Sequence, residues 1–188
     1  TTVVKFMSNL NSLVPVINPN ATEKEVTDGS VVTSIHLYDS KGNLQELRMN
    51  LRKNIDANNV EIQNQWIAAI DVLDQQGRVV NNVQTKTNAN NKNANNKFIL
   101  TFNNAGSLQS ITENQTIAGQ NPVTIGTGKN ESLELNLSYN IPGSNPQNMR
   151  LFLGTSGLYD GITQFASNST VKAYFQDGKP MGYLEGFK

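Results

Sequence analysis

Apolar and polar residues alternate along most of this chain, and a period of two predicts β-strands. The pattern is clearest over residues 31–53, where alternating residues flank a polar turn at 39–43. Alternation on both sides of a turn that contains glycine is typical of a β-hairpin. The same alternation predicts strands over residues 2–10 and 132–139.

Three more hairpins follow from turn signals between apolar runs. They are predicted over residues 97–109, over residues 171–184, and where the turn 74–77 joins the run 65–73 to Val79 and Val80. The run 65–73 fits a short helix or a strand, and the turn after it favours a strand. Residues 22–25 fit one helical turn, and no helix of ten or more residues is predicted. The fold class is therefore predicted to be all-β.

Neutral amides supply much of the polarity. The 188 residues include 28 asparagines against 30 charged residues, and residues 88–96 consist entirely of Asn, Lys and Ala. Asparagine favours turns and weakens helices, so long Asn-rich loops are expected between the strands. The net charge is zero, which argues against nucleic acid or an anionic membrane as partner. The chain has no cysteine, so disulfides and thiol chemistry are excluded.

Candidate catalytic residues are few. His36, the single histidine, falls between Ile35 and Leu37 and is predicted to face solvent on a strand. Asp71 and Asp74 flank a turn, where Asp74 would support the backbone. Glu131 and Glu134 are three positions apart in a predicted strand and would point to opposite faces, so they do not form a glycosidase pair. No catalytic residue is predicted, and the chain is not expected to be an enzyme.

Candidate ligand sites are equally weak. Asp56 with Asn58 and Asn59 lacks the later glutamate and the glycine of a calcium loop. The segment 126–129 lacks the Ser or Thr that follows Lys in a phosphate-binding loop, so a turn is predicted. Aromatic residues such as Trp66 could line a sugar-binding face, but aromatics at strand spacing more often form a core. No metal or cofactor is predicted.

Several segments resemble the bacterial flagellar hook protein family. The hairpin Val32–Lys53 contains Tyr-Asp-Ser-Lys-Gly-Asn, which is similar to that family's signature turn between two alternating strands. Asn9–Ser12 resembles the entry to the family's outer domain, and Gln65–Ile67 its Trp-containing strand. Phe98–Gly106 resembles the family's strand followed by an Asn-rich turn. Gly161–Ala166 and Gln176–Gly178 resemble the family's return toward the next domain.

The resemblance implies a structural subunit of the hook, the flexible universal joint that transmits torque from motor to filament. Residues 1–156 would form an outer, β-barrel-like domain, and residues 157–188 would return toward a more axial domain. The chain is then expected to be an excised piece of a larger protein, exported to the extracellular flagellum. Its partners would be copies of itself in a helical polymer and other axial and junction proteins. The subunit-contact residues are not identified, and the isolated piece is expected to be monomeric.

Two other functions stay open on sequence grounds. A surface adhesin or carbohydrate-binding β-domain would need exposed aromatics on a concave face, near Trp66 or Tyr139. A polysaccharide hydrolase would need two carboxylates that the fold brings together. A resemblance of fold alone does not decide between such functions.

Overall fold

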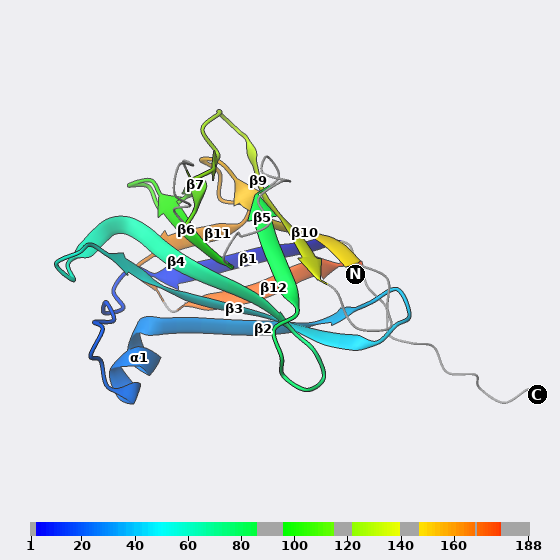
Figure 1. Ribbon diagram of the computed structural model, residues 1–188. Coiled ribbons are helices and arrows are strands. Elements are labelled where there is room, and N and C mark those ends of the chain that lie inside the picture. Colours follow the sequence, from blue (N-terminus) through cyan, green and yellow to red (C-terminus); the bar gives the residue numbers. More distant parts are fainter. Residues whose placement is uncertain (1–2, 86–95, 115–121, 140–146, 168, 178–188) are drawn as a thin grey trace, which may run out of the picture.

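The chain folds as predicted, with strands throughout and one short helix among the described residues (Figure 1). The computed structural model describes residues 3–85, 96–114, 122–139, 147–167 and 169–177. In chain order the elements are β1 (Val3–Asn11), α1 (Glu23–Gly29), β2 (Ser30–Tyr38), β3 (Leu44–Ile55), β4 (Glu61–Leu73), β5 (Asn81–Thr85), β6 (Lys97–Phe102), β7 (Leu108–Glu113), β8 (Thr124–Ile125), β9 (Ser132–Tyr139), β10 (Gln147–Thr155), β11 (Ile162–Phe165) and β12 (Thr170–Gln176).

One sheet contains the hairpins that the alternation predicts. Its strand order is β2-β3-β4-β6-β7-β8, and every neighbouring pair is antiparallel. The β2–β3 and β6–β7 hairpins are confirmed, and the ambiguous run 65–73 belongs to strand β4. Leu47, Met49 and Leu51 of β3 are buried, while the residues between them face outward. This inward face supplies half of the core.

Four turns of this fold share one five-residue design. In each, the first residue is Asp or Asn, and its Oδ1 accepts hydrogen bonds from the backbone N–H groups of the third and fifth residues. The fourth residue has a positive φ angle, which glycine and asparagine tolerate best. The turns span residues 39–43, 56–60, 74–78 and 103–107. The side-chain oxygen at the first position therefore fixes the hairpin in each case.

The second sheet depends on contacts between the two ends of the sequence. Its order is β11-β1-β10-β9-β5, with β12 on the other edge of β1. The first half of β1 pairs in parallel with β10 and its second half with β11, whereas β12 is antiparallel to β1. The start of β1 and the end of β12 thus lie side by side, and the Val3 N–H donates to Asp177 Oδ1 at 3.0 Å.

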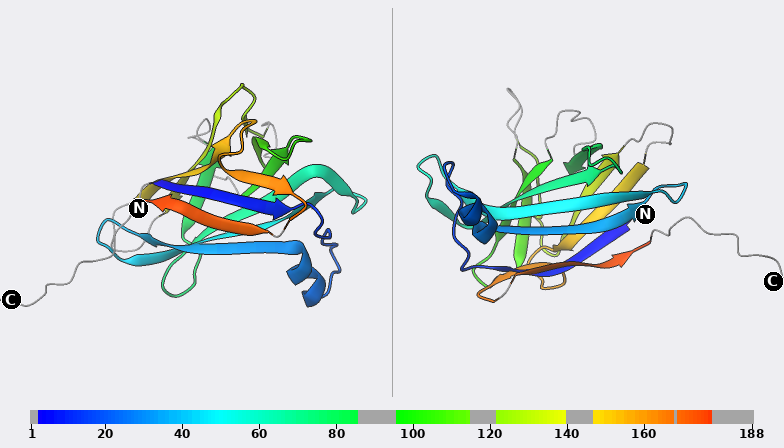
Figure 2. Two further views of the ribbon diagram at one scale, coloured as in Figure 1. Left: turned by 180° about the vertical axis from the view of Figure 1, so that it is seen from behind. Right: turned by 90° about the horizontal axis from the view of Figure 1, so that it is seen from below.

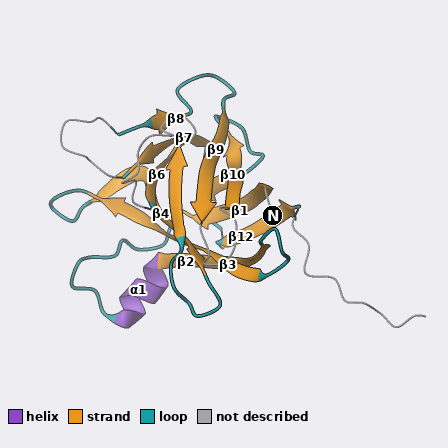
Figure 3. Cartoon of the chain, turned by 45° about the vertical axis from the view of Figure 1, so that its right-hand side comes forward, coloured by secondary structure: helices purple, strands orange, loops and turns teal. Residues whose placement is uncertain are grey.

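The two sheets enclose one core and give the fold its barrel-like form. Figure 2 shows β12 of one sheet running beside β2 of the other, and Figure 3 shows the strands surrounding the interior. Beyond the turn 74–78 the chain crosses from β4 to β5, which pairs with β9. The largest fully buried side chains include Trp66, Phe6, Phe98 and Met49. The predicted all-β, barrel-like class is confirmed, and the parallel pairs of β1 add to the predicted antiparallel hairpins.

The structure differs from the sequence-based expectations at several elements. The hairpin expected at Val79 and Val80 forms but is short: Val79 bridges Leu73 and the Val80 N–H donates to the Val72 carbonyl, and the chain then leaves for the other sheet. Strands β5 and β10 were not anticipated. Helix α1 extends past the expected turn to Gly29, and Thr22 and Glu25 form a reciprocal capping box at its start. Most of the Asn-rich tract 88–96, and the second half of the hairpin expected over 171–184, lie outside the described residues.

Candidate functional site

His36 lies where the alternation places it. Its side chain is exposed on the outer side of β2, and its cross-strand neighbour is Glu46 of β3. Glu46 in turn pairs with Arg48 at 3.2 Å. Among the described residues, no group of three or more His, Asp or Glu side chains is gathered in a way that could hold a metal ion. His36 is therefore part of a solvated strand face.

Asp71 and Asp74 have structural roles. Asp74 Oδ1 accepts from the backbone N–H groups of Gln76 and Arg78, and its Oδ2 accepts from Arg78 Nε at 2.8 Å. The backbone N–H of Arg78 is the main cause that holds the pKa of Asp74 below its ordinary value, although burial opposes the shift. Asp71 accepts from the side-chain amide of Asn96 at 3.0 Å. Both carboxylates are used in fixing the end of β4.

Glu131 and Glu134 do not form a catalytic pair. Glu131 lies just before β9, and its Oε2 accepts the N–H of Gly128 at 3.0 Å. Glu134 lies within β9 and faces Arg150 of β10, with 3.9 Å between Oε2 and Nη1. The Gly128 amide is thus occupied inside its own turn, as the sequence predicted for residues 126–129.

The suggested calcium loop is one of the four hairpin turns. Asp56 Oδ1 accepts from the N–H groups of Asn58 and Val60 at 2.8 and 3.0 Å. Asn59 takes the positive-φ position that glycine occupies in the other three turns. These contacts account for the Asp-Asn-Asn pattern through backbone geometry alone.

Trp66 lies in the core and cannot form a sugar-binding surface. Its side chain is fully buried, and its indole N–H donates to Gln164 Oε1 at 2.7 Å. Gln164 Nε2 donates to Asn64 Oδ1 at 3.1 Å, and Asn64 Nδ2 donates to Asn104 Oδ1 at 2.9 Å. This chain of amides joins β11 of one sheet to β4 and to the β6–β7 turn of the other. The side chain of Tyr139, the other aromatic suggested for such a surface, lies outside the described residues.

Lys53 makes a second tie between distant segments. Only 7% of its side chain is exposed, and its Nζ donates to the Ser12 carbonyl at 2.6 Å and pairs with Glu61 Oε1 at 3.0 Å. Ser12 directly follows β1, whereas Lys53 and Glu61 belong to β3 and β4. The lysine near the end of the signature hairpin therefore holds the exit of β1 against the other sheet. Sequence reasoning noted its position and missed this contact.

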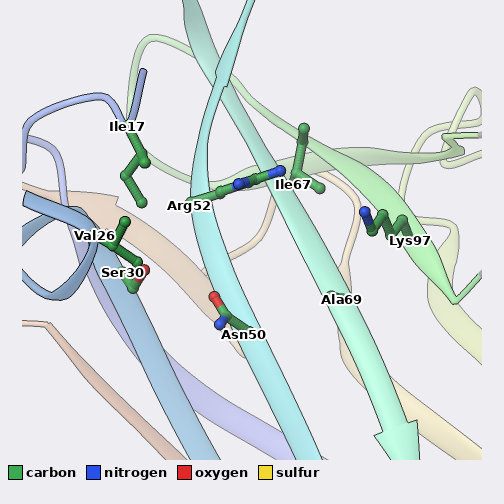
Figure 4. Close-up of a pocket in the computed structure, with 8 residues that line it drawn as sticks. All are labelled: Ile17, Val26, Ser30, Asn50, Arg52, Ile67, Ala69 and Lys97. Atoms are coloured by element: carbon green, nitrogen blue, oxygen red, sulfur yellow. The ribbon is translucent and has the colours of Figure 1, made fainter. Parts of the chain in front are cut away.

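Two surface features remain after the buried contacts are assigned. The first, here named the α1 groove, lies between α1 and the outer face of β3 and β4 and has a volume of about 220 Å³. It is lined by Ile17, Val26, Arg52, Ile67, Ala69 and Lys97 among others (Figure 4). The second, here named the aromatic tip, consists of the exposed side chains Leu158, Tyr159 and Phe165. Both expose apolar side chains, the composition that is typical of interaction sites.

Comparison with known proteins agrees with the resemblance in the sequence. Residues 9–179 match the family model described as Flagellar basal body protein FlaE D2 domain. Flagellar hook protein FlgE of Treponema pallidum (strain Nichols) is 36% identical over 202 residues, covering 100% of this chain and 39% of that protein. Flagellar hook protein FlgE of Borreliella burgdorferi is 31% identical over 192 residues, covering 98% and 36%.

The chain therefore spans well under half the length of these relatives. The family match nonetheless covers most of its residues, including the signature hairpin, the buried Trp66 and the strand that carries Gln164. On this evidence the chain belongs to the flagellar hook protein family and corresponds to its D2 domain region.

Proposed function

We propose that this chain is the outer domain of a hook subunit, and that it contributes contacts between subunits in the joint that bends while transmitting torque from motor to filament. Membership in the family makes it part of a structural protein of the extracellular flagellar hook, not an enzyme. The family match over residues 9–179 is the observation that carries the proposal.

The proposed connection to the rest of the subunit runs through one end of the fold. The start of β1 and the end of β12 are neighbours, and both relatives are much longer than this chain. We propose that residues 1–156 form the outer domain and that residues 157–188 lead back toward a more axial domain. In this arrangement β11 and β12 complete the sheet around β1 before the chain leaves.

The proposed partners are copies of the same subunit in a helical polymer, together with other axial and junction proteins. A contact that has to slide as the joint rotates favours hydrated amide groups over deep anchors. The chain supplies 28 asparagines and a net charge of zero, which limits repulsion between many copies. The isolated chain is expected to be monomeric. Sedimentation equilibrium that gives a tight dimer would contradict this expectation.

Immunogold electron microscopy tests the location. An antibody raised against these 188 residues is applied to intact cells of the source bacterium. Label on a short curved segment between the cell body and the filament supports the proposal. Label spread over the cell surface or along the whole filament contradicts it.

A further inference from the structure

The α1 groove has an aliphatic lining and a cationic rim. Ile17 and Val26 line it from the side of α1, and Ile67 and Ala69 line it from β4. The Arg52 side chain reaches from β3 toward Ile67 (Figure 4), and its guanidinium has no ion-pair partner among the described residues. The groove continues into a second hollow of about 320 Å³ beside Pro19 and Ile55. It offers room for a few side chains, with a positive charge at the edge.

The aromatic tip is held in one shape by its own contacts. The rings of Tyr159 and Phe165 stack with centroids 6.0 Å apart, and the Tyr159 hydroxyl donates to the Ala105 carbonyl. The loop that carries Leu158 and Tyr159 is closed by Asp160, whose carboxylate accepts from the backbone and the hydroxyl of Thr155. Even so, Leu158, Tyr159 and Phe165 are 45%, 55% and 44% exposed. A preorganised loop that displays exposed apolar side chains loses little entropy when it binds.

The two surfaces lie at opposite edges of one sheet. The α1 groove lies over β3 and β4, next to the edge strand β2. The loop of the aromatic tip is bonded to β7 near the other edge, through the Gly157 N–H to the Leu108 carbonyl and the Ser156 hydroxyl to the Gln109 carbonyl. Figures 1 and 3 show α1 and β7 on opposite sides of the molecule. One copy can therefore present its tip while its own groove receives another.

The two surfaces are also complementary. The tip is apolar and carries the exposed carboxylate Asp160, whereas the groove is a hollow with aliphatic residues and Arg52 in its lining. Two different patches that fit each other make a heterologous contact, which propagates into an open-ended assembly when the rotation does not close a ring. A contact of this kind suits a polymer, whereas a two-fold dimer would bring like surfaces together.

We propose that the aromatic tip of one copy of this chain seats in the α1 groove of the next copy, with Asp160 facing Arg52. This inference rests on the proposed function, since it needs a polymer of hook subunits. A few side chains bury much less than the 1,200–2,000 Å² or so of a stable interface. The contact is therefore too small to lock neighbouring subunits against sliding. It is weak in the isolated chain and becomes populated when the polymer holds neighbouring copies at high local concentration.

Disulfide trapping tests the contact in assembled hooks. Val26→Cys and Leu158→Cys are introduced, separately and together, into a full-length subunit in which every cysteine outside these 188 residues is replaced by serine. The 188 residues themselves contain no cysteine. After oxidation the double variant is expected to give a ladder of covalent multimers, and each single variant is expected to stay monomeric. Val79→Cys with Leu158→Cys is the matched control, because Val79 is similarly exposed but belongs to neither surface.

Intact hooks of the double variant that yield only monomers after oxidation would overturn the contact and leave the hook function standing. A wild-type chain that is absent from hooks would instead overturn the proposed function. If the double variant fails to assemble, NMR of the wild-type 188-residue chain at rising concentration decides. Amide shifts confined to the α1 groove and the aromatic tip are expected, and Leu158→Ser is expected to abolish them. Shifts that are absent, or that persist in this variant, would refute the inference.

Discussion

Removing the Gln164 side chain tests whether the amide chain joins the two sheets. In Gln164→Ala, the indole N–H of Trp66 loses its acceptor while its side chain stays fully buried. A buried donor left without a partner costs about 1–3 kcal/mol. For a domain of this size each kcal/mol lowers Tm by roughly 2–4 °C, so we expect a fall of roughly 2–12 °C.

Thermal and urea unfolding of the 188-residue chain measure this loss. Gln63→Ala is the matched control, because Gln63 is exposed on β4, the strand that carries Trp66, and its replacement should change stability by less than about 0.5 kcal/mol. A double-mutant cycle with Trp66→Phe isolates the hydrogen bond, since the penalty of Gln164→Ala should shrink once the indole N–H is gone. Equal losses for Gln164→Ala and Gln63→Ala, or a full penalty in the Trp66→Phe background, would refute the reasoning.

Three further outcomes are expected. Gly106→Ala should lower the urea midpoint more than Gly77→Ala, because both have positive φ but only at Gly106 would an added Cβ lie 2.6 Å from the Gln164 carbonyl; equal midpoints would contradict this. Lys53→Met should lower the free energy of unfolding, measured by chemical denaturation, by about 1–3 kcal/mol, whereas Lys24→Met at an exposed position should leave it unchanged. The stability that the Asp74 carboxylate contributes should be fully present above its ordinary pKa of 3.8 and should be lost as pH falls through its lower native pKa. An Asp74 carboxyl group that titrates by NMR with an unshifted pKa would disprove this expectation.

The local parts of this fold were readable from sequence because their causes are local. The β2–β3 hairpin follows from alternation and from the turn that Asp39 and Gly42 fix, and both signals lie within a few residues. The buried strand β10 also alternates, with Met149, Leu151 and Leu153 inward, and attention to that period would have found it. Strand β5 is polar, so alternation does not predict it. It is a strand because it pairs with β9, which is distant in the sequence.

The contacts of the candidate site were harder to predict from the sequence, for a different reason. The resemblance marked the stretch that contains Gln164 and Phe165, but their contacts with Trp66 and Tyr159 depend on how β11 meets β4 and the loop before it. Likewise, nothing near Lys53 in sequence indicates that its ammonium reaches Ser12. These residues meet only after the two sheets pack, so sequence reasoning could identify the segments and not the contacts.

The position of β1 imposes an order on how this domain folds. The hairpins β2–β3 and β6–β7 close over short loops and can form early, whereas β1 pairs only with strands from the last quarter of the described chain. Contacts between segments so distant in sequence cost a large loop-closure entropy, and they slow the folding of the whole domain. Strand β1 must therefore wait for strands at the other end of this domain. The end of the domain where the start of β1 and the end of β12 meet is set only when folding is complete.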